Sequence, residues 1–123
     1  MIFKKLTLKN FKSHINTEVE FNKGTTIILG DNGAGKSSIF EGINFALYKK
    51  YNTKSLNDLI NTQASSMTVT LSFIVGNQEY KVKRTRSQKK STAELFVLKD
   101  DDYHSVVSGD KEVNNHIDRK SVV

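Results

Sequence analysis

One octet of the sequence constrains the fold more than any other feature: Gly30 to Ser37 reads G-x-x-x-x-G-K-S. An apolar run over residues 25–29 precedes the octet, and from Ser38 to Tyr48 the apolar residues recur at three- and four-residue steps. The first pattern predicts a buried strand and the second predicts a helix. Strand, glycine-rich loop and helix form the context in which this octet binds phosphate. That context argues against the alternative, a glycine-rich turn that carries a solvated lysine.

The residue types of the octet suit a nucleoside triphosphate and its Mg²⁺. The glycines let backbone N–H groups approach phosphate oxygens, and the following helix adds its dipole and its unpaired amides. Lys36 is placed to reach the β- and γ-phosphates, Ser37 supplies a hydroxyl to Mg²⁺, and Ser38 offers a further donor to the α-phosphate. The candidate nucleotide-binding residues of this loop are Asn32, Gly33, Ala34, Gly35, Lys36, Ser37 and Ser38.

Composition limits the class of protein. A length of 123 residues is that of one small domain or part of one. The chain has no Cys, hence no disulfide and no thiolate metal site. It has no apolar run that spans a membrane, and Met1 to Thr7 alternates like a strand rather than a signal peptide, so we expect a soluble intracellular protein. The net charge of +6 favours polyanionic partners, and a bound nucleotide accounts for part of it.

Hydrophobic periodicity predicts the order of the elements. Alternation predicts half-buried strands around Leu6 and Leu8 and around Val19 and Phe21, with Phe11 and Phe21 in the core. Further elements are expected as strands over 67–75, 80–84, 94–98 and 103–107, a polar loop over 86–91, and helices over 55–60, capped by Ser55, and 110–119. Turns are expected at Gly76-Asn77 and at residues 100–102.

Two strands before the loop strand and an antiparallel meander after the first helix do not follow the β-α-β-α order of small GTPases or nucleotide kinases. The pattern predicts an α/β fold with mixed sheets and a P-loop, of the kind found in ABC-type ATPase heads.

Three stretches carry a resemblance to a known family: Leu6 to His14, Val19 to Phe21 and Leu29 to Ile43. Together they closely resemble the N-terminus of SMC-like ATPases. Within that group, Asn10 to His14 is most similar to the DNA double-strand-break repair ATPases of the Rad-fifty family, whose bacterial counterpart is SbcC. The resemblance is strong through Leu47 and colinear in the meander. It implies that residues 1–123 form the N-terminal lobe of a bipartite ABC-type head, which family members interrupt with a coiled coil and complete with a C-terminal lobe.

The resemblance also implies cofactors, partners and further site residues. The cofactors are ATP and Mg²⁺. The partners are the C-terminal lobe, a second head in an ATP-dependent homodimer, a Mre-eleven-type nuclease and DNA, with no membrane, in the cytoplasm or nucleoid of a prokaryote or the nucleus of a eukaryote. By position, Lys12 and Ser13 approach the nucleotide, and Ile60, Asn61 and Thr62 close its pocket. From the residues themselves, Lys12 is equally a solvated lysine and 60–62 is a helix end.

The groups that hydrolyse ATP in that family are not recognisable in the chain. The segment from Phe96 to Asp101 resembles an apolar strand with a terminal acid, but Lys99 interrupts it and Glu is absent, so we read a strand and its turn. Residues 107–111 imitate the signature Ser-Gly-Gly, yet Asp110 places a carboxylate where the γ-phosphate needs a donor, and a turn with a helix cap is the better interpretation. Gln63 lies too early to be the Mg²⁺-sensing glutamine. We therefore expect a lobe that binds nucleotide and does not hydrolyse it by itself.

Basic side chains are densest on the second hairpin strand and in the loop after it. The candidates for DNA contact are Lys81, Lys83, Arg84, Arg86, Lys89 and Lys90. Alternation places Lys81 and Lys83 on one solvent face, which suits phosphate contacts, although a charge run is commonly just a solvated face. His14, His104 and His116 have no metal-ligand spacing.

Three other functions stay open. They are another SMC-type or RecF-like head, a small phosphotransferase or GTPase, and a nucleic-acid-binding module with a vestigial phosphate loop. Asn10 to His14 argues against the first. The second lacks an Asn-Lys-x-Asp guanine motif, and the intact octet argues against the third.

Overall fold

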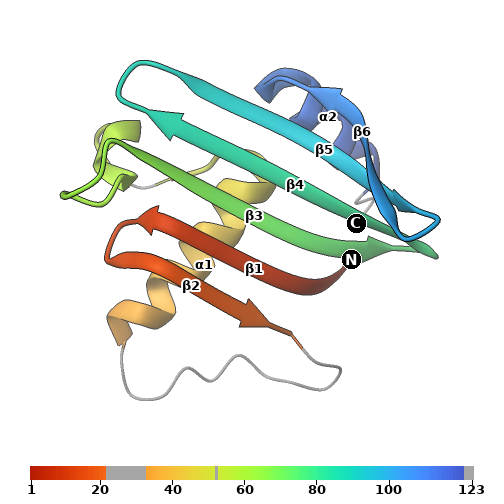
Figure 1. Cartoon of the computed structure of the whole chain (residues 1–123), viewed down its shortest axis with the longest axis horizontal. Coiled ribbons are helices and arrows are strands. Elements are labelled where there is room, and N and C mark those ends of the chain that lie inside the picture. The colour runs from red at the N-terminus through yellow and green to blue at the C-terminus, as the bar shows by residue number, and fades with distance from the viewer. Residues whose placement is uncertain (22–32, 52, 121–123) are drawn as a thin grey trace.

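The computed structural model describes residues 1–21, 33–51 and 53–120, without the side chains of 33–38, 119 and 120 (Figure 1). In chain order the elements are β1 (Ile2–Phe11), β2 (His14–Glu20), α1 (Gly33–Tyr48), the 3-10 helix η1 (Leu56–Leu59), β3 (Ser66–Val75), β4 (Gln78–Ser87), β5 (Ser91–Lys99), β6 (Asp102–Ser108) and α2 (Asp110–Lys120).

Within the described residues the strands form one six-stranded sheet in the order β2-β1-β3-β4-β5-β6, and every neighbouring pair is antiparallel (Figure 1). Strands β3 to β6 form the expected antiparallel meander. The β3–β4 and β5–β6 turns use left-handed backbone conformations: Gly76 has φ 64°, and Asp100 and Asp101 have φ 52° and 66°. Two successive left-handed residues match the twist of a two-residue hairpin. The strand expected over 25–29 lies outside the described residues.

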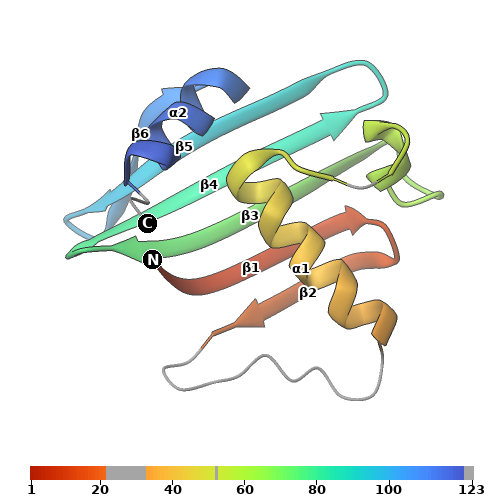
Figure 2. The ribbon, with the colours of Figure 1, turned by 180° about the vertical axis from the view of Figure 1, so that it is seen from behind.

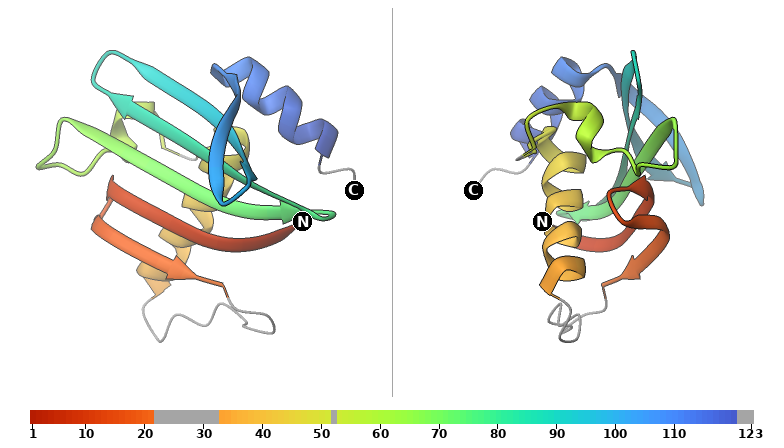
Figure 3. Two further views of the ribbon diagram at one scale, coloured as in Figure 1. Left: turned by 45° about the vertical axis from the view of Figure 1, so that its right-hand side comes forward. Right: turned by 90° about the vertical axis from the view of Figure 1, so that its left-hand side faces the viewer.

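Both α-helices pack on one face of the sheet (Figure 2). Helix α1 crosses β1 and β3, whereas α2 lies over β5 and β6. Seen along the sheet, the opposite face has no described helix (Figure 3). The core between helices and sheet is built by buried apolar side chains of every layer: Leu6, Leu8, Val69, Leu71, Phe73, Val82 and Leu95 from the sheet, Ile39, Ile43, Ala46 and Leu47 from α1, and Val113 and Ile117 from α2.

The alternation in the sequence predicts the two sheet faces correctly. Leu6 and Leu8 are fully buried, as is Phe11, and Phe21 is partly buried with its ring centroid 6.0 Å from that of Phe3. The predicted Ser55 cap is confirmed, because Ser55 Oγ accepts a hydrogen bond from Asn57 N and the Asp58 carboxylate accepts one from Ser55 N.

Several boundaries differ from the prediction, chiefly because β4, β5 and α1 are longer than expected. Helix α1 begins at Gly33 rather than at Ser38. The loop expected over 86–91 is shorter, because β4 runs to Ser87 and β5 starts at Ser91, with Ser87 N donating to Lys90 O at 2.8 Å. Neither described α-helix has the length and apolar composition needed to cross a membrane.

Candidate functional site

The N-terminus of α1 carries most of the predicted phosphate-binding octet. Because α1 begins at Gly33, the amides of its first turn have no carbonyl partner inside the helix. That turn contains no acidic residue, so nothing in it opposes an anion at the positive end of the helix dipole. Asn32 lies outside the described residues, as do the side chains of Lys36, Ser37 and Ser38. Their contacts with ATP and Mg²⁺ therefore stay predictions, and the helix start is compatible with them.

The turn between β1 and β2 lies against the segment that follows η1. Lys12 has a left-handed backbone, with φ 53°, and its N–H donates to Leu59 O at 2.7 Å. Asn61 Nδ2 donates to Lys12 O at 2.7 Å, and Asn61 N donates to Asn10 O at 2.7 Å. The structure thus brings Lys12 and Asn61, which are 49 residues apart in sequence, into direct contact.

The other candidates at this turn have different surroundings. Phe11 forms an isolated antiparallel bridge with Ile60, and both side chains are buried in the core. Ile60 is therefore a core residue that holds the segment in place. Ser13 and Thr62 are exposed, which leaves their side chains accessible to a ligand.

The ammonium group of Lys12 forms an ion pair with Glu41 of α1. The side chains of Lys12 and Glu41 are 25% and 21% exposed. Glu41 follows Ser37 by four residues, so the two positions lie on the same helix face. Lys12 is thus neither freely solvated nor remote from the octet. Sequence reasoning missed Glu41, although this four-residue spacing from Ser37 was a usable signal.

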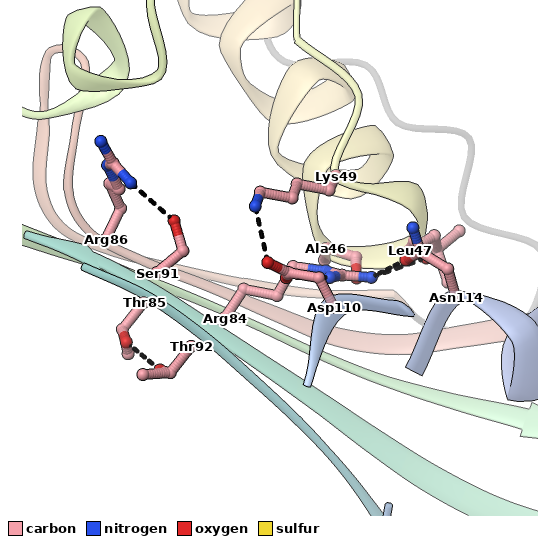
Figure 4. Close-up of polar contacts among 10 residues, drawn as sticks. All are labelled: Ala46, Leu47, Lys49, Arg84, Thr85, Arg86, Ser91, Thr92, Asp110 and Asn114. Atoms are coloured by element: carbon pink, nitrogen blue, oxygen red, sulfur yellow. Dashed lines mark hydrogen bonds and ion pairs between the residues drawn. The ribbon is translucent and has the colours of Figure 1, made fainter. Parts of the chain in front are cut away.

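Arg84 corrects the predicted DNA surface, because its side chain is only 1% exposed and points at the helices. Its Nε donates to Ala46 O at 2.7 Å and its Nη2 donates to Leu47 O at 3.1 Å, at the end of α1 (Figure 4). Its Nη1 donates to Asp110 Oδ1 at 3.0 Å.

Two further side chains complete the Arg84 cluster, which we define as Arg84, Asp110, Lys49 and Asn114 (Figure 4). Lys49 Nζ lies 2.6 Å from Asp110 Oδ2, and Arg84 Nη2 also donates to Asn114 Oδ1. Burial lowers the pKa of the Arg84 guanidinium, and the Asp110 carboxylate opposes that shift. The sequence carried the signal: the alternation that places Lys81 and Lys83 on the solvent face places Arg84 on the buried one.

The remaining basic candidates occupy three places. Arg86 lies on the helix face, where its Nε donates to Asn57 Oδ1 at 3.0 Å and its Nη1 to Ser91 Oγ at 2.9 Å. Lys89 and Lys90 are exposed in the β4–β5 turn.

Lys81 and Lys83 do lie on the other face of the sheet, which no described helix covers and which we call the open face. Lys83 is exposed, and Lys81 Nζ is 4.2 Å from the ring centroid of Tyr103 and 5.0 Å from that of Phe96. A hollow of about 400 Å³ beside Lys83 is lined by the hydroxyl-bearing residues Thr85, Ser91, Thr92 and Ser108 and by Glu94.

The comparisons with known proteins identify the family. A family model described as "AAA domain" matches residues 5–122. The chain belongs to the AAA-domain family.

Within this family, the "DNA double-strand break repair Rad50 ATPase" of Methanococcus maripaludis is 44% identical over 98 residues, which are 79% of this chain and 10% of that protein. The protein of the same name from Thermoplasma acidophilum is 34% identical over 122 residues, 99% of this chain and 14% of that protein. The solved "SMC head domain from Thermotoga maritima" has a TM-score of 0.68 and 28% identity, and the match covers 94% of this chain and 42% of that one. These matches confirm the resemblance that the motifs indicate. The chain nevertheless spans only 10% and 14% of the length of the two curated relatives.

Two segments of this AAA-domain chain imitate hydrolysis motifs. In the structure they form a strand end with its turn and a turn that leads into a helix. Strand β5 ends at Lys99 and the turn at Asp100 follows, as predicted. Ser108 ends β6, Gly109 has φ 96°, and α2 begins at Asp110. The turn and helix start are as predicted, but the Asp110 carboxylate binds Arg84 and Lys49.

Proposed function

We propose that this chain is the ATP-binding N-terminal lobe of an ATPase that repairs DNA double-strand breaks. The observation that supports it most is that α1 starts inside the phosphate-binding octet, with no acidic residue in its first turn. Lys12 is held against the same helix by its ion pair with Glu41. In this proposal Lys36 binds the β- and γ-phosphates, while the Ser37 hydroxyl holds Mg²⁺, which neutralises charge on the same phosphates. Asn61 then orients the Lys12 turn through the hydrogen bond of its side chain to Lys12 O.

The rest of the active enzyme is proposed to come from other parts. The C-terminal lobe of the same protein supplies the hydrolytic residues, and ATP joins two such heads into a homodimer. A Mre-eleven-type nuclease and DNA ends complete the assembly, in the cytoplasm or nucleoid of a prokaryotic cell. The short span of the chain within its relatives supports a further lobe in the full protein.

Titration with Mg-ATP tests the nucleotide site. The chain is expected to bind Mg-ATP, and Lys36→Ala is expected to weaken binding by about tenfold or more, since a charge-assisted contact contributes roughly 1.5–3 kcal/mol. Hydrolysis is expected only after a separately expressed C-terminal lobe is added. Rapid hydrolysis by the chain without that lobe would contradict the proposal and indicate a complete P-loop enzyme of another kind.

A second element of the proposal is DNA contact at the open face of the sheet through Lys81 and Lys83. Alternation along β4 places both lysines on the face that has no described helix (Figure 3), and the hydroxyl-bearing residues beside Lys83 offer further donors to phosphate. Arg84 takes no part, because it is buried.

Salt-dependent duplex binding by the assembled head tests this surface. Changing both Lys81 and Lys83 to Glu is expected to lower affinity and to make the slope of log K against log salt shallower by about 2, one unit per lost phosphate contact. A matched control changes Lys54 and Lys111 to Glu, because both are exposed, both lie outside the sheet and the total charge change is the same. Equal slopes for the two double variants would contradict a specific DNA-binding surface and would mean that DNA affinity depends only on the net charge of the protein.

A further inference from the structure

We propose that Glu41 competes with ATP for the ammonium group of Lys12 and thereby sets the nucleotide affinity of the lobe. The inference rests on the proposed function, in which ATP lies at the N-terminus of α1. It assigns a role to Glu41, a residue that the phosphate-binding octet does not include.

The backbone of Lys12 is fixed, so only its side chain can change partner. Its N–H is bonded to Leu59 O and its carbonyl to Asn61 Nδ2, both at 2.7 Å. The neighbouring hydrogen bond from Asn61 N to Asn10 O, also 2.7 Å, anchors the residues before the turn. The side chain therefore extends from a fixed Cα toward α1, and its four-carbon stem rotates to place the ammonium group.

On the face of α1 in front of Lys12, two positions can present an anion to the ammonium group. One is the Glu41 carboxylate, which holds the ammonium group in the structure. The other is the first helical turn, Gly33 to Lys36, where a bound phosphate is expected. The nearest residue of that turn lies five positions before Glu41, about 7–8 Å along the helix axis, and the ammonium group covers this shift when the lysine stem rotates about its fixed Cα. A move of the ammonium group to phosphate thus requires it to leave Glu41.

Glu41 opposes a bound anion in a second way, because it is the one acidic residue between Gly33 and Tyr48. Its charge lies on the same helix face as Ser37, and it repels phosphate when Lys12 no longer neutralises it. The Glu41 side chain is 21% exposed, whereas the side chains of the Lys5–Glu18 ion pair between β1 and β2 are 43% and 55% exposed. Solvent therefore screens the charge of Glu41 less than it screens the charges of that pair. Both effects have the same sign: the carboxylate weakens nucleotide binding.

A double-mutant cycle on Mg-ATP affinity tests the competition. Glu41→Gln keeps the size of the side chain and removes its charge, and it is expected to lower Kd about two- to fivefold, the range of one partly exposed ion pair. In a Lys12→Met background the same substitution is expected to lower Kd by clearly less, because no ammonium group is left to release. Glu18→Gln, which breaks the Lys5–Glu18 pair, is the matched control and is expected to leave Kd unchanged.

The cycle separates competition from a structural role. A residue that only stabilises the fold would weaken both urea resistance and ATP binding when mutated, whereas Glu41→Gln is expected to tighten binding while stability stays equal or falls slightly. Glu41→Asp, which shortens the side chain and keeps its charge, serves as a second variant and is expected to lower Kd less than Glu41→Gln does.

Two results overturn the inference in distinguishable ways. If Lys36→Ala abolishes binding but Glu41→Gln weakens it or leaves Kd unchanged, the nucleotide site stands and the competition is wrong. If the chain does not bind Mg-ATP, or binds it equally well after Lys36→Ala, the proposed function fails and the inference fails with it.

Discussion

Two neighbouring residues of β4 show how differently the two faces of the sheet use the same charge. Arg84 faces the helices, is 1% exposed and donates hydrogen bonds to Ala46 O, Leu47 O and Asp110. Lys83, one position earlier, stands on the open face and is exposed. The difference teaches that position along the alternating strand decides the role of a basic residue, and that charge by itself does not.

The energetic consequence differs as much as the exposure. The last carbonyls of a helix have no partner inside it, and Arg84 satisfies two of them at the end of α1. A buried guanidinium is costly to desolvate, and the Asp110 carboxylate offsets that cost. Lys83 keeps its hydration and contributes little to stability. The helix face therefore holds the fold together, whereas Lys83 on the opposite face stays accessible.

The largest expected effect is at Arg84. Replacing Arg84 by Met fills part of the volume but leaves two carbonyls of α1 and the Asp110 carboxylate with fewer partners. We expect the free energy of unfolding to fall by roughly 3 kcal/mol, since breaking a buried, hydrogen-bonded charge pair is strongly destabilising. Urea denaturation followed by circular dichroism measures it.

Lys83→Met is the control for Arg84→Met, because it makes the same change one residue away on the other face. Its effect is expected within about 0.5 kcal/mol, as for most surface substitutions. If both variants lost the same free energy of unfolding, the two sheet faces would not differ in how their basic residues contribute to stability.

A smaller effect is expected at Gly42, where α1 packs tightly against Leu8 of β1. A Cβ atom added at Gly42 would lie 2.7 Å from Leu8 Cδ2, and Leu8 is fully buried. Gly42→Val is therefore expected to push α1 from the sheet at a cost of about 1–3 kcal/mol, the usual range for overpacking. Because α1 carries the octet, Mg-ATP affinity is expected to fall as well. Asn44→Val places the same branched side chain on the exposed side of α1 and is expected to cost clearly less; a comparable loss there would mean that contact with Leu8 is not the cause.

The sequence predicts the parts of this molecule that depend on neighbours along the chain. Alternation in 67–75, the Ser55 cap and the turn at Asp100 are local signals, and the structure confirms them. The octet is local too, but it predicts a loop up to Ser37, whereas α1 already begins at Gly33. The ion pairs are not local: Lys49 and Asp110 are 61 residues apart, and Arg84 meets Ala46 only because α1 packs on β4. Arg84 was misassigned because a count of basic residues ignores which way each one points.

The smallest effect tests whether the open face contributes to stability through protonation. Tyr103 donates a hydrogen bond to Glu79 Oε2 at 2.6 Å, and partial burial, followed by this hydrogen bond, raises the pKa of the Tyr103 phenol. A group with a raised pKa in the folded state stabilises the fold fully below its unfolded pKa, about 10 for tyrosine, and loses that contribution as pH rises through the folded pKa. The stability of the wild-type protein minus that of Tyr103→Phe is therefore expected to be constant from pH 7 to 9 and to decrease above about pH 10. Urea midpoints of both proteins across this range measure the difference, in which the titrations of the other tyrosines and of the lysines cancel. If the two pH profiles run parallel, the Tyr103–Glu79 contact carries no linked proton, and the open face stabilises the fold through its backbone ladder and side-chain packing without help from ionisation.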